Sequence, residues 1–353
     1  MPVLTRQDSI AGRHDAPSEK SITAMTENRP PQNSPMPPLT ILFTVFLCAL
    51  FGANAVAIKV TMAGIGPLTM AAMRFSMAAV AISLWAHFTG RSRPLQPGQW
   101  HHLLFIAVLF TAQLTLFYLG LSKTHASRGT LLANLQPFFT LFLAHFFIAN
   151  DRITARKLIG LALGFGGVAC VYWEQHGGGG QLRTGDLLIT CAAFLWAANG
   201  VYVKRIIDDF EPHQVILYPM IVAVPCFLAG AVIWDGEMVF NITPTVVLAL
   251  LYQGLVTAAF GFVAWNQLLQ RYGAVALHSF IFIMPVSGVI LGGALLSEPI
   301  TLKILLALLL ICLGLTVVSY PKWLRWTAKL WLWVGLATVA FLGISVAINY
   351  GPF

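Results

Sequence analysis

The chain has 353 residues, of which 58% are hydrophobic and only 10% are charged, whereas an ordinary soluble domain holds roughly 45–50% and 25%. This composition excludes a soluble globular protein. The net charge of +8 does not indicate a nucleic-acid partner, because the basic residues lie in short connections between apolar blocks, where they orient membrane helices. The five cysteines form no C-x-x-C pair and lie in apolar blocks, so we predict no metal, disulfide or cofactor site.

Residues 1–38 contain no apolar run and are rich in Pro, Ser and Asn. We expect a disordered cytoplasmic tail without a cleavable signal peptide. Met36 directly precedes the first apolar block, so translation from either Met1 or Met36 stays open, and N-terminal sequencing distinguishes the two starts.

The apolar blocks that follow are about twenty residues long, which is the length an α-helix needs to cross a hydrocarbon layer of about 30 Å. They lack the alternation of barrel strands, and a segment in lipid must close its own backbone hydrogen bonds, so each is predicted to be a helix. The expected spans are 39–58, 67–88, 100–121, 126–148, 156–173, 186–204, 213–234, 245–269, 274–296, 300–319 and 330–348.

The positive charges predict the orientation of these spans. With the N-terminus in the cytoplasm, most of the 21 Lys and Arg residues fall on the inner side. The outer side receives Lys59, Lys123, Arg128, Arg183 and Lys303, and Arg74 falls within a span. Because cytoplasmic loops are enriched in Lys and Arg, the bias predicts a multi-pass protein of a bacterial cytoplasmic membrane with its N-terminus inside.

Sequence features of the first half recur in the second. The segment Leu50–Lys59 of the first span matches Leu195–Lys204 of the sixth. Further matches follow in the same order, namely Pro137 with Pro285, Ile153-Thr154 with Ile300-Thr301, and Gly167 with Gly314. We therefore predict two five-helix repeats, 39–173 and 186–319, joined by a Gly-rich linker at 174–185 and followed by a basic loop and an extra helix within 320–353. Because each repeat crosses the membrane an odd number of times, the second repeat enters the membrane from the side opposite to the first. Many secondary transporters have such inverted repeats.

Several short motifs occur in a fixed order along the two repeats. They are Gly52, Asn54 and Lys59 near the end of the first span, Pro67 and Arg74-Phe75 in the second, Phe117-Tyr118 followed by Ala126 and Pro137, then Gly185-Asp186, Trp196-Ala197 and Ser297-Glu298-Pro299-Ile300-Thr301. Together they resemble the drug/metabolite transporter superfamily in its EamA-type branch. The resemblance implies an all-α, ten-helix membrane fold, export or exchange of small metabolites, and a cavity between the repeats. It does not imply one substrate.

Two features depart from that pattern. Asn150-Asp151-Arg152 stands where the first repeat of the family reads Gly-Glu-Arg, a change that keeps the charges. Residues 330–348 are uncharged and long enough for an eleventh span that the family lacks. The alternative of a surface helix is weaker, because the segment has no polar face.

Arg74 is the residue that we expect to carry a charge within a span, and an intramembrane charge indicates function by default. No Asp or Glu lies deep in any span. We therefore hypothesise that Arg74 recognises a carboxylate or phosphate of the cargo; the alternative is a structural arginine that snorkels to the interface or holds a helix end. The lack of a deep carboxylate also predicts weak or absent proton coupling, with His278 as the one plausible carrier.

Further candidates for contact with a small-molecule substrate are polar or aromatic residues near mid-membrane depth. They are Asn54, Gln113, Tyr118, Asn134, Gln136, Trp196, Asn199, Gln253, Trp265, Asn266 and His278. Asn54 and Asn199 occupy equivalent repeat positions, with Gly52 and Gly200 nearby to permit close helix approach. For every candidate the alternative is a hydrogen bond between helices without a role in transport. Pro137, Pro219, Pro225 and Pro285 interrupt spans and are candidate hinges, although proline is common in membrane helices.

Other functions are less well supported by the sequence. A membrane enzyme needs a cluster of catalytic groups, and the chain has no H-E-x-x-H, G-x-S-x-G or P-loop motif. The run Gly177–Gly180 lacks a following Lys-Ser/Thr and is predicted to be a flexible link. A channel or a structural membrane protein remains the main alternative, and the oligomeric state is left open.

The orientation is testable at the C-terminus. Ten repeat spans return the chain to Lys322 and Arg325 on the inner side, and an eleventh then crosses. A reporter that is active only in the cytoplasm, fused after Phe353, should therefore be silent. An active reporter would show that 330–348 does not span.

Overall fold

The computed structural model describes residues 36–88, 95, 98–147, 154–173, 180–207, 210, 213–278 and 280–319. Within these ranges the chain is helical and contains no strand beyond one isolated bridge between Ile65 and Val239. The helices of the first half are α2 (Pro38–Thr61), α3 (Pro67–Phe88), α4 (Trp100–Lys123), α5 (Ala126–Ala133), α6 (Gln136–Phe147) and α7 (Ala155–Trp173). Those of the second half are α8 (Gly180–Ile206), α9 (Gln214–Trp234), α10 (Pro244–Leu251), the π-helix η3 (Tyr252–Gly261), α11 (Phe262–His278), α12 (Ile283–Leu296) and α13 (Leu302–Ser319).

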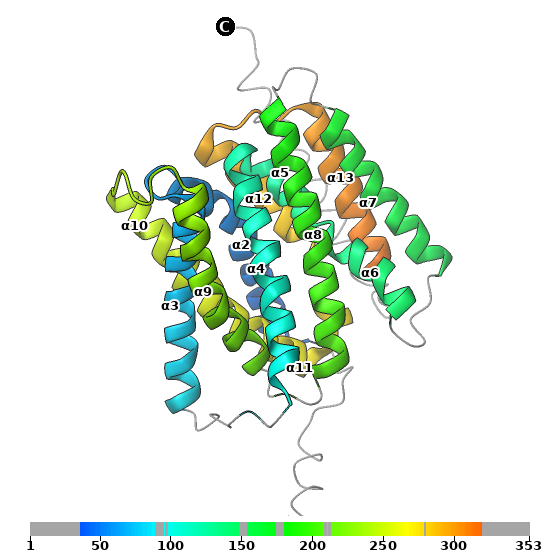
Figure 1. Ribbon diagram of the computed structural model, residues 1–353. Coiled ribbons are helices and arrows are strands. Elements are labelled where there is room, and N and C mark those ends of the chain that lie inside the picture. The colour runs from blue at the N-terminus through cyan, green and yellow to red at the C-terminus, as the bar shows by residue number, and fades with distance from the viewer. Residues whose placement is uncertain are drawn as a thin grey trace, which may run out of the picture.

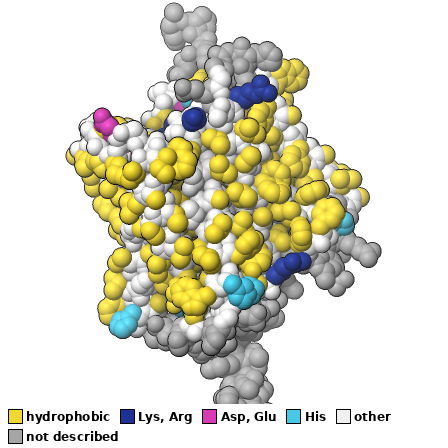
Figure 2. Space-filling model, in the orientation of Figure 1, with side chains coloured by type: hydrophobic (Ala, Val, Ile, Leu, Met, Phe, Trp, Pro, Cys, Tyr) yellow, Lys and Arg dark blue, Asp and Glu magenta, His cyan; other side chains and the backbone are white. Residues whose placement is uncertain are grey.

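The helices form an upright bundle (Figure 1). Eight segments of the described chain are long and apolar enough to cross a bilayer, and the shorter apolar helices Ile283–Leu296 and Leu302–Val318 follow. Hydrophobic side chains cover the middle of the face seen in Figure 2, and charged and His side chains lie toward its upper and lower ends. So large an exposed apolar surface fits contact with lipid. The all-α membrane class is confirmed, while the total of ten or eleven spans stays a prediction.

Two predicted spans are interrupted at equivalent places. The fourth divides into α5 and α6 at Asn134-Leu135, and turn residues Phe280–Phe282 precede α12 in the ninth. Each break lies directly before a repeated proline, so Pro137 and Pro285 fall in the first turn of α6 and α12, where no intrahelical N–H bond is lost. Pro219 and Pro225 instead lie inside the continuous helix α9.

Other predicted boundaries need correction. The loop expected between 269 and 274 is wrong, because α11 continues through Arg271 and Gly273 as far as His278. The linker expected over 174–185 is also too long, since α8 begins at Gly180. Of the tail predicted over 1–38, residues 1–35 lie outside the described residues, and so does the predicted eleventh span; α2 begins at Pro38.

The packing of the helices repeats under exchange of the two halves. Helix α4 packs against α8, and its counterparts α10 and η3 pack against α2. Likewise α6 contacts α8 while α12 contacts α2, and α4 contacts α9 while η3 contacts α3. The remaining large contacts join equivalent helices, α3 with α9 and α7 with α13. This pairwise exchange is what a pseudo-two-fold axis between inverted repeats requires.

Glycines allow the closest of these helix contacts. A Cβ atom on Gly314 of α13 would lie 2.8 Å from the Gly160 carbonyl oxygen of α7, and one on Gly160 would lie 3.0 Å from the Gly314 carbonyl oxygen. Gly52 likewise faces the backbone and side chain of α12 at Met284 and Ser287. Gly200 was expected to permit an equally close helix approach, and this prediction is wrong, because the nearest atom to a Cβ atom at Gly200 would be 4.0 Å away.

The α7–α13 contact should therefore tolerate no side chain at Gly314. We expect Gly314→Leu to lower the stability of the purified protein by about 1–3 kcal/mol, because overpacking forces the helices apart. Thermal unfolding in detergent measures the change, and Gly200→Leu, at an exposed glycine, is the control. An unchanged unfolding temperature for Gly314→Leu would contradict this account of the interface.

Candidate functional site

Arg74 is buried within the bundle. Its side chain on α3 is only 5% exposed, so the alternative in which it snorkels to the membrane surface is wrong. Nη1 donates to the Tyr118 hydroxyl on α4 at 3.0 Å, and Nη2 donates to the Thr257 hydroxyl on η3 at 3.3 Å. The guanidinium therefore connects both halves of the chain through neutral hydroxyl groups.

The hydrogen bonds extend from Thr257 to two further helices. Its hydroxyl lies 3.1 Å from the Asn54 side-chain oxygen on α2 and 2.7 Å from the Gln253 main-chain oxygen. Gln253 Nε2 in turn donates to the Thr61 hydroxyl at 2.6 Å and to the Ala57 carbonyl at 3.2 Å. We call Asn54, Thr61, Arg74, Tyr118, Gln253 and Thr257 the Arg74 cluster.

The second half contributes to this cluster through a π-helix. Gln253 and Thr257 both lie on η3, which spans ten residues between α10 and α11. A π-helical segment is rare and occurs frequently at functional sites. Tyr252 fixes the start of η3 to α2, because its hydroxyl donates to the Leu50 carbonyl at 2.7 Å.

Hydrogen bonding in the Arg74 cluster is incomplete. Arg74 Nε and Gln253 Oε1 are both buried and have no hydrogen-bond partner within the described structure. An unsatisfied buried donor or acceptor costs about 1–3 kcal/mol, and more when it is charged. The Gln253 amide cannot simply be reversed, since its Nε2 position faces the Ala57 carbonyl. The cluster thus presents one free donor and one free acceptor.

A pocket of about 740 Å³ lies toward the end of the bundle where α2 ends and α3 begins. This is the upper end in Figure 1, and we call it the outer end after the predicted orientation. Met62 and Leu119 line the pocket and directly follow Thr61 and Tyr118 of the cluster in sequence. Lys59, Lys123, Asp235 and Glu237 make its wall mixed in charge. Its volume is in the range of small-molecule sites, about 300–1,000 Å³.

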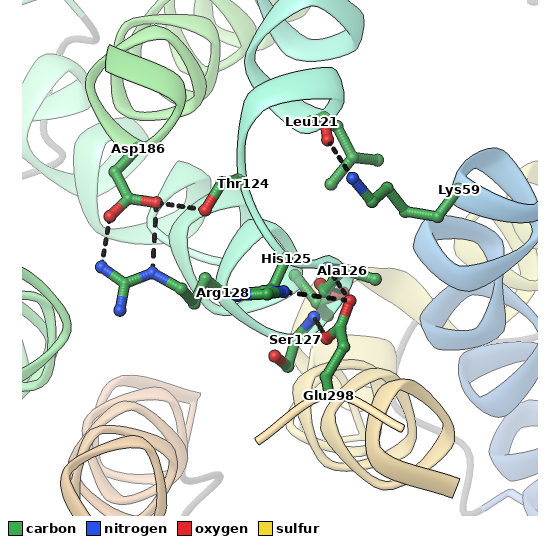
Figure 3. Close-up of polar contacts among 10 residues, drawn as sticks. Lys59, Leu121, Thr124, His125, Ala126, Ser127, Arg128, Asp186 and Glu298 are labelled. Atoms are coloured by element: carbon green, nitrogen blue, oxygen red, sulfur yellow. Dashed lines mark hydrogen bonds and ion pairs between the residues drawn. The ribbon is translucent and has the colours of Figure 1, made fainter. Parts of the chain in front are cut away.

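A buried ion pair joins the repeats at the outer end (Figure 3). Arg128 of α5 forms two contacts with the Asp186 carboxylate of α8, through Nε at 3.4 Å and through a shorter bond from Nη2. Thr124 also donates to Asp186, at 2.7 Å, and Arg128 Nη2 donates to the Val171 carbonyl at 2.9 Å. The sequence places Arg128 on the outer side, at the start of the fourth span, and the structure adds that its side chain is buried.

Two more carboxylates of the second half bind helix ends of the first. Glu298 accepts the backbone N–H groups of Ala126 and Ser127 at 2.6 and 2.8 Å, at the N-terminus of α5 (Figure 3). Asp235 accepts those of Leu68 and Thr69 at 3.2 and 2.8 Å, at the N-terminus of α3. The free N–H groups and dipole of a helix N-terminus favour an anion. We call Asp186, Asp235 and Glu298 with these partners the outer contacts.

Within the described residues, no side-chain hydrogen bond joins the other predicted site residues to the Arg74 cluster. Gln113 on α4 and Asn199 on α8 are buried, and each has a side-chain oxygen without a partner. Asn134 donates to the Thr130 carbonyl in its own turn, and Gln136 donates to Thr140. Trp196 is 37% exposed. Trp265 packs edge-on against Phe51, and the side chains of Asn266 and His278 lie outside the described residues.

Sequence reasoning found three members of the cluster, Asn54, Arg74 and Tyr118, and proposed Gln253 from its depth. It missed Thr257 and Thr61, because threonine is common in membrane helices and gives no signal of its own. It also missed the outer contacts. The motifs Gly185-Asp186 and Ser297-Glu298 marked two of the carboxylates, but their partners are far away in sequence.

Comparison with known proteins places the chain among membrane transporters. The family model described as "EamA-like transporter family" matches residues 38–173 and 183–320, one copy for each half. A "Probable amino-acid metabolite efflux pump" of Escherichia coli is 26% identical over 81% of this chain and 95% of its own. An uncharacterized transporter of Bacillus subtilis is 26% identical over 80% of this chain and 93% of its own. A solved crystal structure shares the fold, with a TM-score of 0.59 and 16% identity over 78% of this chain and 94% of that one.

The Arg128–Asp186 pair allows a test of how the repeats are held together. Removing one partner leaves a buried charge, so Arg128→Met and Asp186→Leu should each destabilise the protein by about 3–5 kcal/mol. The double variant should be more stable than either single variant, because no unpaired charge remains. Thermal unfolding of the four proteins measures the coupling. Additive losses would contradict a direct pair.

Proposed function

The chain belongs to the EamA-like transporter family and is a membrane transporter, and we propose that it exports or exchanges small metabolites, such as amino acids or drug-like compounds, across a bacterial cytoplasmic membrane by alternating access. The observation that carries the proposal is the Arg74 cluster, a buried polar site with unsatisfied atoms formed by helices of both repeats. Transporter sites of inverted-repeat proteins lie at this interface.

The arrangement of the outer contacts supports alternating access. Asp186, Asp235 and Glu298 come from the second half, and their partners Arg128, α3 and α5 belong to the first. These bonds hold the repeats together at one end of the bundle, so movement of one repeat against the other would break them there. The helix breaks before Pro137 and Pro285 give each repeat a point at which a helix can bend.

The similar efflux pumps support amino acids as one cargo class. Both the Escherichia coli protein and a Salmonella typhimurium protein, each 26% identical to this chain, carry the name "Probable amino-acid metabolite efflux pump". A buried arginine and neutral amide groups suit a small polar metabolite better than a purely apolar one. A channel remains the second candidate.

Reconstitution into liposomes tests the proposal. Purified protein should give saturable flux of at least one member of a panel of amino acids, nucleosides and cationic drugs, and a trans gradient of the same compound should accelerate it. The cargo should also raise the thermal stability of the protein by mass action. Flux that rises linearly with concentration and is unaffected by the trans side would instead identify a channel.

We further expect transport without strict proton coupling. The acidic residues that the structure describes lie at the outer end of the bundle. None of them is hydrogen-bonded to a member of the Arg74 cluster. Proteoliposomes should therefore show flux without an imposed pH gradient. Strict dependence on the gradient that persists in His278→Ala would refute this and point to Glu298 or Asp186.

A further inference from the structure

The free atoms of the Arg74 cluster define more than an anion site. Arg74 Nε is a charged donor and Gln253 Oε1 is a neutral acceptor, and both are buried without a partner. They belong to one short chain of bonds, because Thr257 accepts from Arg74 and lies against the Gln253 main-chain oxygen. A molecule that satisfies both must offer an acceptor to Arg74 and a donor to Gln253.

The charge balance of the site selects the acceptor group. Arg74 is the one cation among the six residues of the cluster, and its partners there are hydroxyls. The nearby Lys59 ammonium donates to the Leu121 carbonyl at 3.0 Å and lines the outer pocket. One guanidinium balances one negative charge, and its planar fork matches a carboxylate. A dianionic phosphate would bring an uncompensated charge into the bundle, which is costly.

The Gln253 oxygen selects the donor group. An amide oxygen accepts hydrogen bonds from an ammonium or hydroxyl group. No carboxylate bonds to the cluster within the described residues, so a cargo ammonium would be held by neutral oxygens, with its charge balanced by its own carboxylate. A zwitterion adds no net charge to the site and thereby avoids the cost of a buried unpaired ion.

We propose that the Arg74 cluster is the recognition site for the α-amino carboxylate group of a zwitterionic cargo, with the carboxylate on Arg74 and the ammonium on Gln253 Oε1. The inference rests on the proposed transport function and specifies which part of the cargo the site binds. The pocket at the outer end is lined by Met62 and Leu119, which directly follow Thr61 and Tyr118 of the cluster in sequence. The side chain of the cargo contributes nothing to this pair of contacts, so selection among amino acids depends on other residues.

The test compares three compounds with one side chain. In proteoliposomes of the full-length protein, leucine, 3-methylbutylamine and 4-methylpentanoate compete against uptake of the amino acid that is transported best in a panel of standard amino acids. We expect the amine, which lacks the carboxylate, and the acid, which lacks the ammonium, each to compete about tenfold or more weakly than leucine.

Variants assign each preference to one residue. Arg74→Gln should abolish the preference for leucine over the amine, and Arg74→Lys should reduce it, because the charge remains but the fork is lost. Gln253→Met should abolish the preference for leucine over the acid and leave the other preference intact. Tyr252→Phe, which removes a helix-to-helix bond on the same π-helix, and Arg205→Gln, at an exposed arginine, should keep both preferences. Each preference is a ratio within one variant, so it does not depend on the amount of folded protein.

The outcomes separate this inference from the proposed function. Saturable transport of amino acids with equal competition by the amine, or an unchanged preference in Arg74→Gln or Gln253→Met, would overturn the recognition site and leave the transport function standing. Failure of the wild type to transport any amino acid, with saturable flux of another compound, would overturn the zwitterion proposal and redefine the cargo. Absence of saturable flux for the whole panel would overturn both.

Discussion

The structure depends on a guanidinium held inside a membrane bundle without a carboxylate. Burying a charge in a medium of low dielectric constant is costly unless hydrogen bonds replace its water. Arg74 obtains such bonds from Tyr118 on α4 and Thr257 on η3. These partners belong to different repeats, so the position of the charge fixes the first repeat against the second. A change in the relative position of the repeats would therefore change the hydrogen bonds of Arg74.

The buried carboxylates lie elsewhere in the bundle than Arg74. They are placed at the outer end, where Asp235 and Glu298 bind helix N-termini and Asp186 binds Arg128. Anions at helix N-termini are stabilised by free N–H groups and by the helix dipole, so these contacts hold the ends of α3, α5 and α8 without a continuous apolar interface. These carboxylates are buried as well, so separation of the repeats at this end requires water to replace their hydrogen bonds. The molecule thus combines a polar centre with separable polar contacts at one end.

Much of this organisation could be predicted from the sequence, because membrane physics constrains it strongly. The length of the apolar blocks predicted the helices. The match of Leu50–Lys59 to Leu195–Lys204 predicted the repeats. Arg74 and Asn54 were found because polar residues are conspicuous in apolar helices. The π-helix could not be predicted, since Tyr252–Gly261 has the composition of any membrane helix. Nor could the pairing of Arg128 with Asp186, which depends on how α5 packs against α8.

The proposed alternating access requires the two repeats to separate at the outer end during transport. Leu119 lines the outer pocket, so Leu119→Cys in a background without the five native cysteines reports access from that end. Asp235→Asn together with Glu298→Gln weakens two outer contacts and should increase the rate at which a membrane-impermeant maleimide labels Leu119→Cys. The control is Leu187→Cys, at an exposed position on α8. Its labelling rate should be the same with and without the two carboxylate substitutions. A labelling rate at Leu119→Cys that does not respond to loss of these contacts would contradict the account.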